Sequence, residues 1–205
     1  MAKDGRSRTN RVTRRRFLQT VTAAGAGAAG GYDFASLHRA LTETQTGWTL
    51  DLCGETLATG EAKGILLGGC LTMVEASLGT AWELDTRGAI LLLEDCKMKP
   101  YQVDRSLLHL RQAGKLDGVR GIIFGDFPEC DPPKGSRVTV RDVLLRHVRG
   151  WGVPVVWDTP VGHTRRAMLT LPLGVRARLR AGRARAARNA STTWLDILEP
   201  ACAKA

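Results

Sequence analysis

The chain has 205 residues, 43% of them hydrophobic, which is enough for one sizeable core and excludes wholesale disorder. Its formal net charge of +10 comes from two segments: residues 1–16 hold seven basic residues and one acid, and residues 176–188 hold six arginines and no acid. Without these segments, 17 basic residues face 19 acidic ones. A broad basic face is therefore not expected, and neither is a nucleic-acid partner.

The five cysteines lie far apart and form no C-x-x-C pair, so we expect no metal and no cofactor, and we interpret the thiols as small buried side chains. They are Cys53, Cys70, Cys96, Cys130 and Cys202. No apolar run approaches the roughly 20 residues that a membrane-spanning helix needs. No stable membrane anchor is therefore expected.

The N-terminal segment looks like a targeting signal. Residues 13–19 (Thr-Arg-Arg-Arg-Phe-Leu-Gln) resemble the twin-arginine export motif, and an Ala/Gly-rich stretch follows them up to Gly30. Residues 1–30 are thus expected to be an export signal, which would place the protein in the periplasm or outside the cell. The alternative is a disordered basic tail on a cytoplasmic protein.

From Gly64 onward, short apolar runs alternate with amphipathic stretches. The runs predict strands and the stretches predict helices, in this chain order: strand 64–69, helix 71–78, strand 89–93, helix 103–113, strand 119–124, helix 140–148 and strand 153–157. Strands that alternate with helices indicate an α/β fold with a layered sheet.

The last part of the chain changes to strict alternation. Val175, Ala177 and Leu179 alternate with arginines, which predicts a half-exposed strand with a solvated arginine face. Residues 181–188 are expected to form a long hairpin loop, and 194–198 the return strand. The fold should therefore end in an antiparallel hairpin.

Eight short segments carry a family resemblance. In chain order they are Leu66-Leu67-Gly68-Gly69, Leu78-Gly79-Thr80, Leu91-Leu92-Leu93-Glu94-Asp95, Tyr101-Gln102-Val103-Asp104-Arg105, Ala113-Gly114, Gly125-Asp126-Phe127, Pro160-Val161-Gly162-His163-Thr164 and Leu171-Pro172-Leu173-Gly174. Together they resemble the LD-carboxypeptidase family of serine peptidases, which includes murein tetrapeptide carboxypeptidases and microcin-immunity amidases. The resemblance implies that residues 59–200 are the C-terminal domain of that family, acting on muropeptides or other small peptides, and that the protein forms a homodimer.

The same resemblance implies two catalytic residues. The family uses a Ser-Glu-His triad, and its glutamate and histidine correspond to Glu94 and His163. The local sequence agrees, because Glu94 ends an apolar strand and His163 follows another strand on a loop with Pro160 and Gly162. Such a histidine can carry a proton while the carboxylate orients it. Without the family, His163 would be read as a turn residue, and Glu94 with Asp95 as a solvated strand end.

The nucleophile is the element that does not match. The family's serine lies in a Gly-x-Ser-Asp turn before a helix, whereas here Gly31-Tyr32 is followed directly by Asp33. Residues 31–58 are accordingly interpreted as a remnant of the N-terminal nucleophile domain. Ser36 is the nearest hydroxyl, but on a helix that starts at Asp33 it would lie about one turn from the required position.

Two functions therefore stay open. The chain is either a serine peptidase that removes a terminal D-amino acid from peptidoglycan peptides, with its activity in doubt because the serine is absent, or a non-catalytic remnant or binding module of the same fold.

Overall fold

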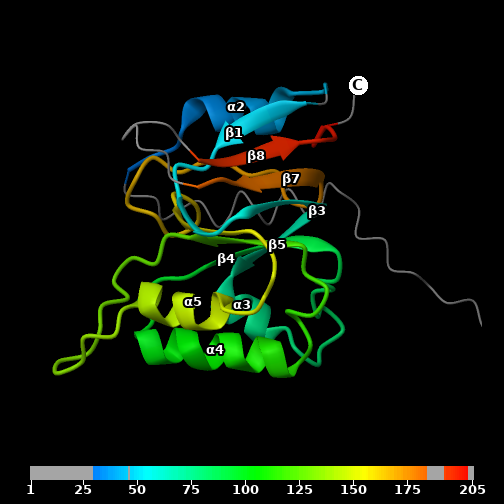
Figure 1. Ribbon diagram of the computed structural model, residues 1–205. Coiled ribbons are helices and arrows are strands. Elements are labelled where there is room, and N and C mark those ends of the chain that lie inside the picture. The colour runs from blue at the N-terminus through cyan, green and yellow to red at the C-terminus, as the bar shows by residue number, and fades with distance from the viewer. Residues whose placement is uncertain (1–29, 46, 184–191, 203–205) are drawn as a thin grey trace, which may run out of the picture.

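The computed structural model describes residues 30–45, 47–183 and 192–202 (Figure 1). The expected export segment and most of the expected hairpin loop lie outside these residues. The described part contains these elements in chain order: α2 (Phe34–Thr42), β1 (Trp48–Asp51), β2 (Glu55–Ala58), β3 (Gly60–Cys70), α3 (Leu71–Ala76), β4 (Ala89–Glu94), α4 (Pro100–Gln112), β5 (Gly121–Gly125), α5 (Val140–Val148), β6 (Val155–Thr159), β7 (Arg176–Ala181) and β8 (Thr193–Ile197).

All of these strands belong to one mixed sheet with the order β1-β8-β7-β3-β4-β5-β6-β2. The four strands β3, β4, β5 and β6 run parallel to one another, and the strands on both sides of them are antiparallel to their neighbours. Helices α3, α4 and α5 form a layer over the parallel strands, while α2 lies at the far end of the molecule beside β1 (Figure 1).

The sheet is strongly curled. Its two edge strands, β1 and β2, are separated in the chain only by residues 52–54, so the edges must come close to each other. Gly54 makes the connection: its backbone N–H donates to Thr193 Oγ1 on β8 at 3.2 Å, and a Cβ atom on it would lie 2.6 Å from the Trp157 carbonyl on β6. The curled sheet therefore encloses a core of its own.

Two apolar clusters result, one on each face of the parallel strands. Leu91 and Leu93 of β4 pack toward the helices, whereas Ile90 and Leu92 belong to the cluster enclosed by the curled sheet. This double burial explains why β4 is a continuous apolar run rather than an alternating one. It also holds the end of the strand, where Glu94 lies, in a fixed place.

The helix ends follow from local sequence. Pro100 starts α4, where its missing N–H costs nothing, and the Lys99 backbone N–H donates to the Gln102 side chain at 2.7 Å. Thr139 caps α5 in a reciprocal arrangement with Asp142. The predicted helix began at residue 103, three residues after the observed start of α4 at Pro100. The prediction did not recognise Pro100 as the first residue of the helix.

The predicted α/β fold with a layered sheet and a final antiparallel hairpin is confirmed, since β7 pairs with β8 from Ala177↔Ile197 to Ala181↔Thr193. The sequence missed β1 and β2. Both belong to the single sheet, so the sheet crosses the boundary expected at residue 59 between a remnant and the C-terminal domain.

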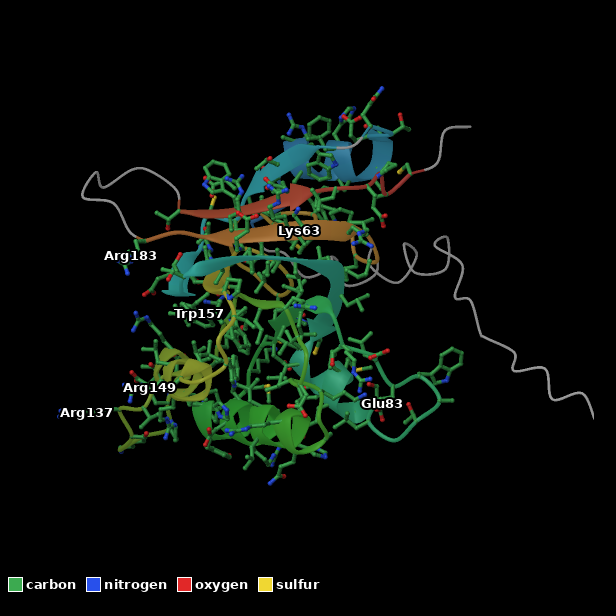
Figure 2. All side chains as sticks on the ribbon, turned by 45° about the vertical axis from the view of Figure 1, so that its right-hand side comes forward. Lys63, Glu83, Arg137, Arg149, Trp157 and Arg183 are labelled. Carbon is green, nitrogen blue, oxygen red and sulfur yellow. The ribbon has the colours of Figure 1, made fainter. Side chains whose placement is uncertain are left out.

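Charged side chains are spread over the surface: Arg137 and Arg149 flank α5, whereas Lys63 lies on the strand side (Figure 2). The predicted arginine face of β7 is partly neutralised, since Arg180 forms two hydrogen bonds with Asp196 on β8. No helix in the described part of the chain is both long enough and apolar enough to cross a membrane.

Candidate active site

Glu94 and His163 meet at the carboxyl edge of the parallel strands. Glu94 is the last residue of β4, and His163 lies on the loop after β6. Nδ1 of His163 is 2.7 Å from Oε2 of Glu94, and the His163 backbone N–H donates to the same oxygen at 3.0 Å. The glutamate side chain is 6% exposed and the imidazole 40% exposed. The carboxylate is thus buried, whereas the histidine that contacts it is partly open to solvent.

This geometry assigns roles to the two imidazole nitrogens. An ionised carboxylate only accepts hydrogen bonds, so Nδ1 must carry the proton that Glu94 binds. The neutral ring then has a free lone pair on Nε2, which can accept a proton from a nucleophile or donate it to a leaving group. The described residues therefore bring together an imidazole and a buried carboxylate that can orient it.

Two glycines allow the close approach. Gly162 has a φ of +77°, and a Cβ atom there would overlap the Glu94 carboxylate. A Cβ atom on Gly125 would lie 2.7 Å from both Cβ of Glu94 and Cγ2 of Val161. The segment Pro160–His163 thus brings the imidazole onto the carboxylate because glycine precedes it.

Asp95 has a different role from its neighbour. Its Oδ2 atom accepts hydrogen bonds from the backbone N–H (2.9 Å) and the hydroxyl (2.7 Å) of Thr72, and Oδ1 accepts from the Cys96 N–H at 2.8 Å. It therefore ties the end of β4 to the first turn of α3. As whole residues, Glu94 is 4% exposed and Asp95 is 5% exposed. The alternative interpretation of this pair as a solvated strand end is therefore wrong.

A second carboxylate fixes the other side of the histidine loop. Asp126, which follows β5, accepts a 2.8 Å hydrogen bond from the hydroxyl of Thr164, whose side chain is fully buried. Arg166 lies 3.6 Å from the same carboxylate and forms a 2.9 Å ion pair with Asp158. Burial raises the pKa of Asp158, and the Arg166 charge opposes this rise. Asp126 and Thr164 lie within the segments that resemble the family, but no role was predicted for either residue.

The Ser36 hydroxyl is buried and bonded to backbone groups. The residue is 1% exposed; its hydroxyl donates to the Asp33 carbonyl at 3.0 Å and accepts the Thr170 N–H, also at 3.0 Å. Asp33 caps α2 by accepting the Ser36 N–H. Within the described ranges, no hydroxyl forms a hydrogen bond with His163.

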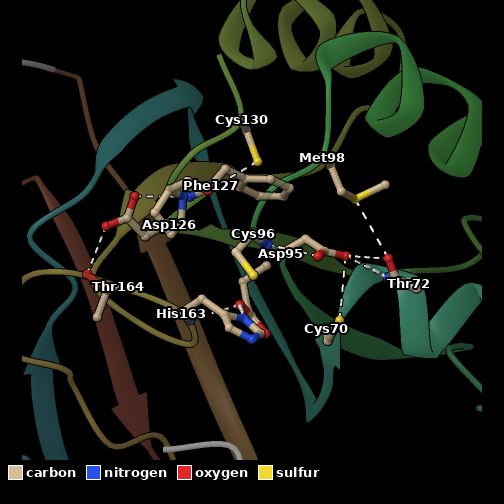
Figure 3. Close-up of polar contacts among 12 residues, drawn as sticks. Cys70, Thr72, Asp95, Cys96, Met98, Asp126, Phe127, Cys130, His163 and Thr164 are labelled. Atoms are coloured by element: carbon tan, nitrogen blue, oxygen red, sulfur yellow. Dashed lines mark hydrogen bonds and ion pairs between the residues drawn. The ribbon is translucent and has the colours of Figure 1, made fainter. Parts of the chain in front are cut away.

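Three thiols lie near the pair. Cys70 pairs with Glu94 in the β3–β4 register, and Cys96 and Cys130 appear on the neighbouring loops (Figure 3). All five cysteines are free, and Cys130 alone is fully buried, so the interpretation of the cysteines as small buried residues is wrong for Cys53, which is exposed. Burial raises the pKa of Cys70 to about 11. At neutral pH this thiol is protonated and is a poor nucleophile.

The described residues contain no group of three or more histidine, cysteine, aspartate or glutamate side chains that could hold a metal ion.

The similarity of this chain to known proteins identifies its family. The family model described as the LD-carboxypeptidase C-terminal domain matches residues 63–179. A putative carboxypeptidase of Streptomyces coelicolor is 39% identical over 159 residues, which is 74% of this chain and 50% of that protein. A probable murein peptide carboxypeptidase of Bacillus subtilis is 36% identical over 145 residues, 70% of this chain and 45% of that protein.

Solved structures show the same fold. The muramoyltetrapeptide carboxypeptidase from Oxalobacter formigenes superposes with a TM-score of 0.67 at 29% identity, over 82% of this chain and 55% of the other. The microcin C7 self-immunity protein MccF, in complex with aspartyl sulfamoyl adenosine, gives a TM-score of 0.60 at 27% identity, over 73% of this chain and 42% of the other. The chain spans about half the length of these relatives. It belongs to the LD-carboxypeptidase family and contains that family's C-terminal domain.

Proposed function

We propose that Glu94 and His163 are the acid–base pair of a serine carboxypeptidase that removes a terminal D-amino acid from peptidoglycan peptides. The observation that carries this proposal is the 2.7 Å contact between Nδ1 of His163 and the buried carboxylate of Glu94. The substrate class follows from relatives named as murein peptide and muramoyltetrapeptide carboxypeptidases.

In this proposal His163 transfers one proton twice. Nε2 takes the proton of a serine hydroxyl as its oxygen attacks the scissile carbonyl carbon, and then gives it to the departing amine of the D-amino acid. Water repeats the sequence on the acyl-enzyme and restores the serine. Glu94 holds the imidazole in the required tautomer and stabilises the imidazolium that forms between the two transfers.

The serine is the component that the described residues do not bring to His163. The segment that resembles the family's nucleophile turn nevertheless lies beside the histidine loop. The Gly31 carbonyl accepts the Met168 N–H at 2.9 Å, and the Asp33 N–H donates to the Met168 carbonyl at 2.9 Å. This docking supports an inherited position for the turn, with the serine missing between Tyr32 and Asp33. Loss of a serine nucleophile costs about six decades of rate in a well-studied hydrolase.

We therefore propose that the described part needs a nucleophile from elsewhere and is nearly inert without one. D-alanine release from a muramyl tetrapeptide tests this. The chain should release none above the level of its own His163→Ala variant. The same chain joined to the nucleophile half of a relative should release it.

In the joined protein, Glu94→Gln and His163→Ala should each abolish release, while Ser36→Ala should leave it unchanged. Full release by either of the first two variants would overturn the assigned roles. If the joined protein stays inactive while the relative's own halves are active, the second function, a binding module without catalysis, is the correct one.

We also propose export through the twin-arginine-like segment and assembly as a homodimer. A reporter fused to residues 1–35 should leave the cytoplasm, and a reporter that stays in the cytoplasm would contradict the proposed export. A monomeric mass measured by light scattering would contradict the proposed homodimer.

A further inference from the structure

A groove of about 790 Å³ lies at the end of the sheet opposite Glu94 and His163. It is bounded by residues 61–63 of β3 and by the segments that lead into β4, β5 and β6. Glu94 closes β4 at its carboxyl end, whereas Arg87 and Gly88 precede the same strand at its amino end. The groove is therefore separate from the candidate active site.

Three basic side chains line this groove, and little negative charge neutralises them. Lys63, Arg87 and Arg120 are exposed, and no ion pair or side-chain hydrogen bond joins them to the other described residues. The one acid in the lining, Glu61, lies 3.4 Å from Arg178 Nε on β7 and is thus already shared. Asp85, close to Arg87 in sequence, accepts the backbone N–H of Arg87.

The groove wall is built from fixed backbone. The Gly88 N–H donates to the Gly118 carbonyl at 2.8 Å, which joins the segments before β4 and β5. A Cβ atom on Gly118 would lie 3.2 Å from Cγ of Arg87, so the stem of this arginine runs over the glycine. The Ile122 N–H donates to the Pro154 carbonyl at 2.9 Å, which joins β5 to the segment before β6. The stem of Arg87 thus lies along the wall, and its guanidinium forms no ion pair with any other residue in the described ranges.

We propose that this groove binds a small phosphate-bearing anion. Like charges that converge without counter-charges repel one another, and an anion removes that repulsion. Guanidinium groups offer paired donors that match phosphate oxygens, and the ammonium adds a third charge. Neither the acid–base pair nor its supporting residues use these side chains, so the inference does not depend on the proposed peptidase function.

Titration of the ¹⁵N-labelled chain with inorganic pyrophosphate at constant ionic strength tests the proposal. Saturable shifts are expected at the amides of Gly88, Gly118 and Gly152, which lie in the groove. The double variant Arg87→Ala/Arg120→Ala should bind about tenfold or more weakly, because two charge-assisted contacts are lost. Glu61→Gln should bind more tightly, because it removes the one negative charge of the lining.

Arg146→Ala/Arg149→Ala is the matched control, since it removes the same charge from the α5 region outside the groove. It should leave the affinity unchanged. Non-saturable shifts, or equal weakening by the two double variants, would show general screening and overturn the site. Acetate should compete poorly, and acetate binding as tight as that of pyrophosphate would overturn the assignment to phosphate.

Discussion

The hydroxyl of Thr164 donates a 2.8 Å hydrogen bond to Oδ2 of Asp126, and this bond fixes the residue that directly follows His163. Because the Thr164 side chain is fully buried and its acceptor is a carboxylate, we expect Thr164→Val to lower the free energy of unfolding by about 1.5–3 kcal/mol, the range for a hydrogen bond to a charged group. Urea denaturation measures this change. Thr49→Val removes a similar bond to Asp196 at an exposed position and should cost less. Equal losses for the two variants would contradict a special role for Asp126.

Gly162→Ala should separate the acid–base pair. The new methyl group would overlap the Glu94 carboxylate, and the residue would keep a φ of +77°. We expect a loss of stability of about 3 kcal/mol, from overpacking together with the left-handed backbone. Gly79→Ala is the control, since Gly79 has a φ of +73° but nothing within 4 Å of the added Cβ atom. It should lose only about 1 kcal/mol.

Lys97 is one of three non-glycine residues with positive φ near the carboxyl edge of the sheet, with Glu129 and Asp158. Such strain is often concentrated at functional sites. Lys97→Gly relieves it, so this variant should be more stable than Lys97→Ala by about 1 kcal/mol. At Arg105, an exposed position inside α4, glycine should instead be the less stable of the two substitutions by about 1 kcal/mol. Thermal and urea denaturation of all four variants measure the contrast.

The pH dependence of Cys70 follows from its burial, which raises the pKa to about 11. Iodoacetamide alkylation of Cys70 in the folded chain should accelerate about tenfold per pH unit between pH 7 and 10, because the thiolate reacts. In the urea-unfolded chain the rate should level off near pH 8.5. Since the folded state favours the neutral thiol, its contribution to stability is complete below about pH 8.5 and is lost as the pH rises toward 11. A plateau at pH 8.5 in the folded chain would contradict this environment.

The hydrophobic periodicity of the sequence was sufficient to predict the layered part of the fold. Strands β4 and β5 are compact apolar runs buried on both faces, and the intervening amphipathic stretches became α3, α4 and α5. The two edge strands were missed for a physical reason. Each has four residues with several polar side chains, and β1 exists because it pairs with β8, about 150 residues later in the chain. Local sequence carries no signal for such a pairing.

The candidate site, too, could be predicted only in part from the sequence. Glu94 and His163 were found through the family resemblance, because two residues 69 positions apart have no local pattern in common. No role was predicted for Asp126 and Thr164, because the hydrogen bond between them joins two loops that meet only once the sheet has formed. The signal that could have found them is the position of Asp126 directly after a buried strand, in the same place relative to β5 that Asp95 takes relative to β4.

The proposed roles of both residues depend on the proton between His163 and Glu94. Long-range ¹H–¹⁵N NMR at a pH where the ring is neutral reports which imidazole nitrogen carries it. We predict the Nδ1–H tautomer in the wild-type chain, with Nε2 unprotonated, and a shift toward the Nε2–H tautomer in Glu94→Ala, in which the 2.7 Å contact is lost. An Nε2–H tautomer in the wild-type chain would contradict the assignment of Nε2 as the catalytic base.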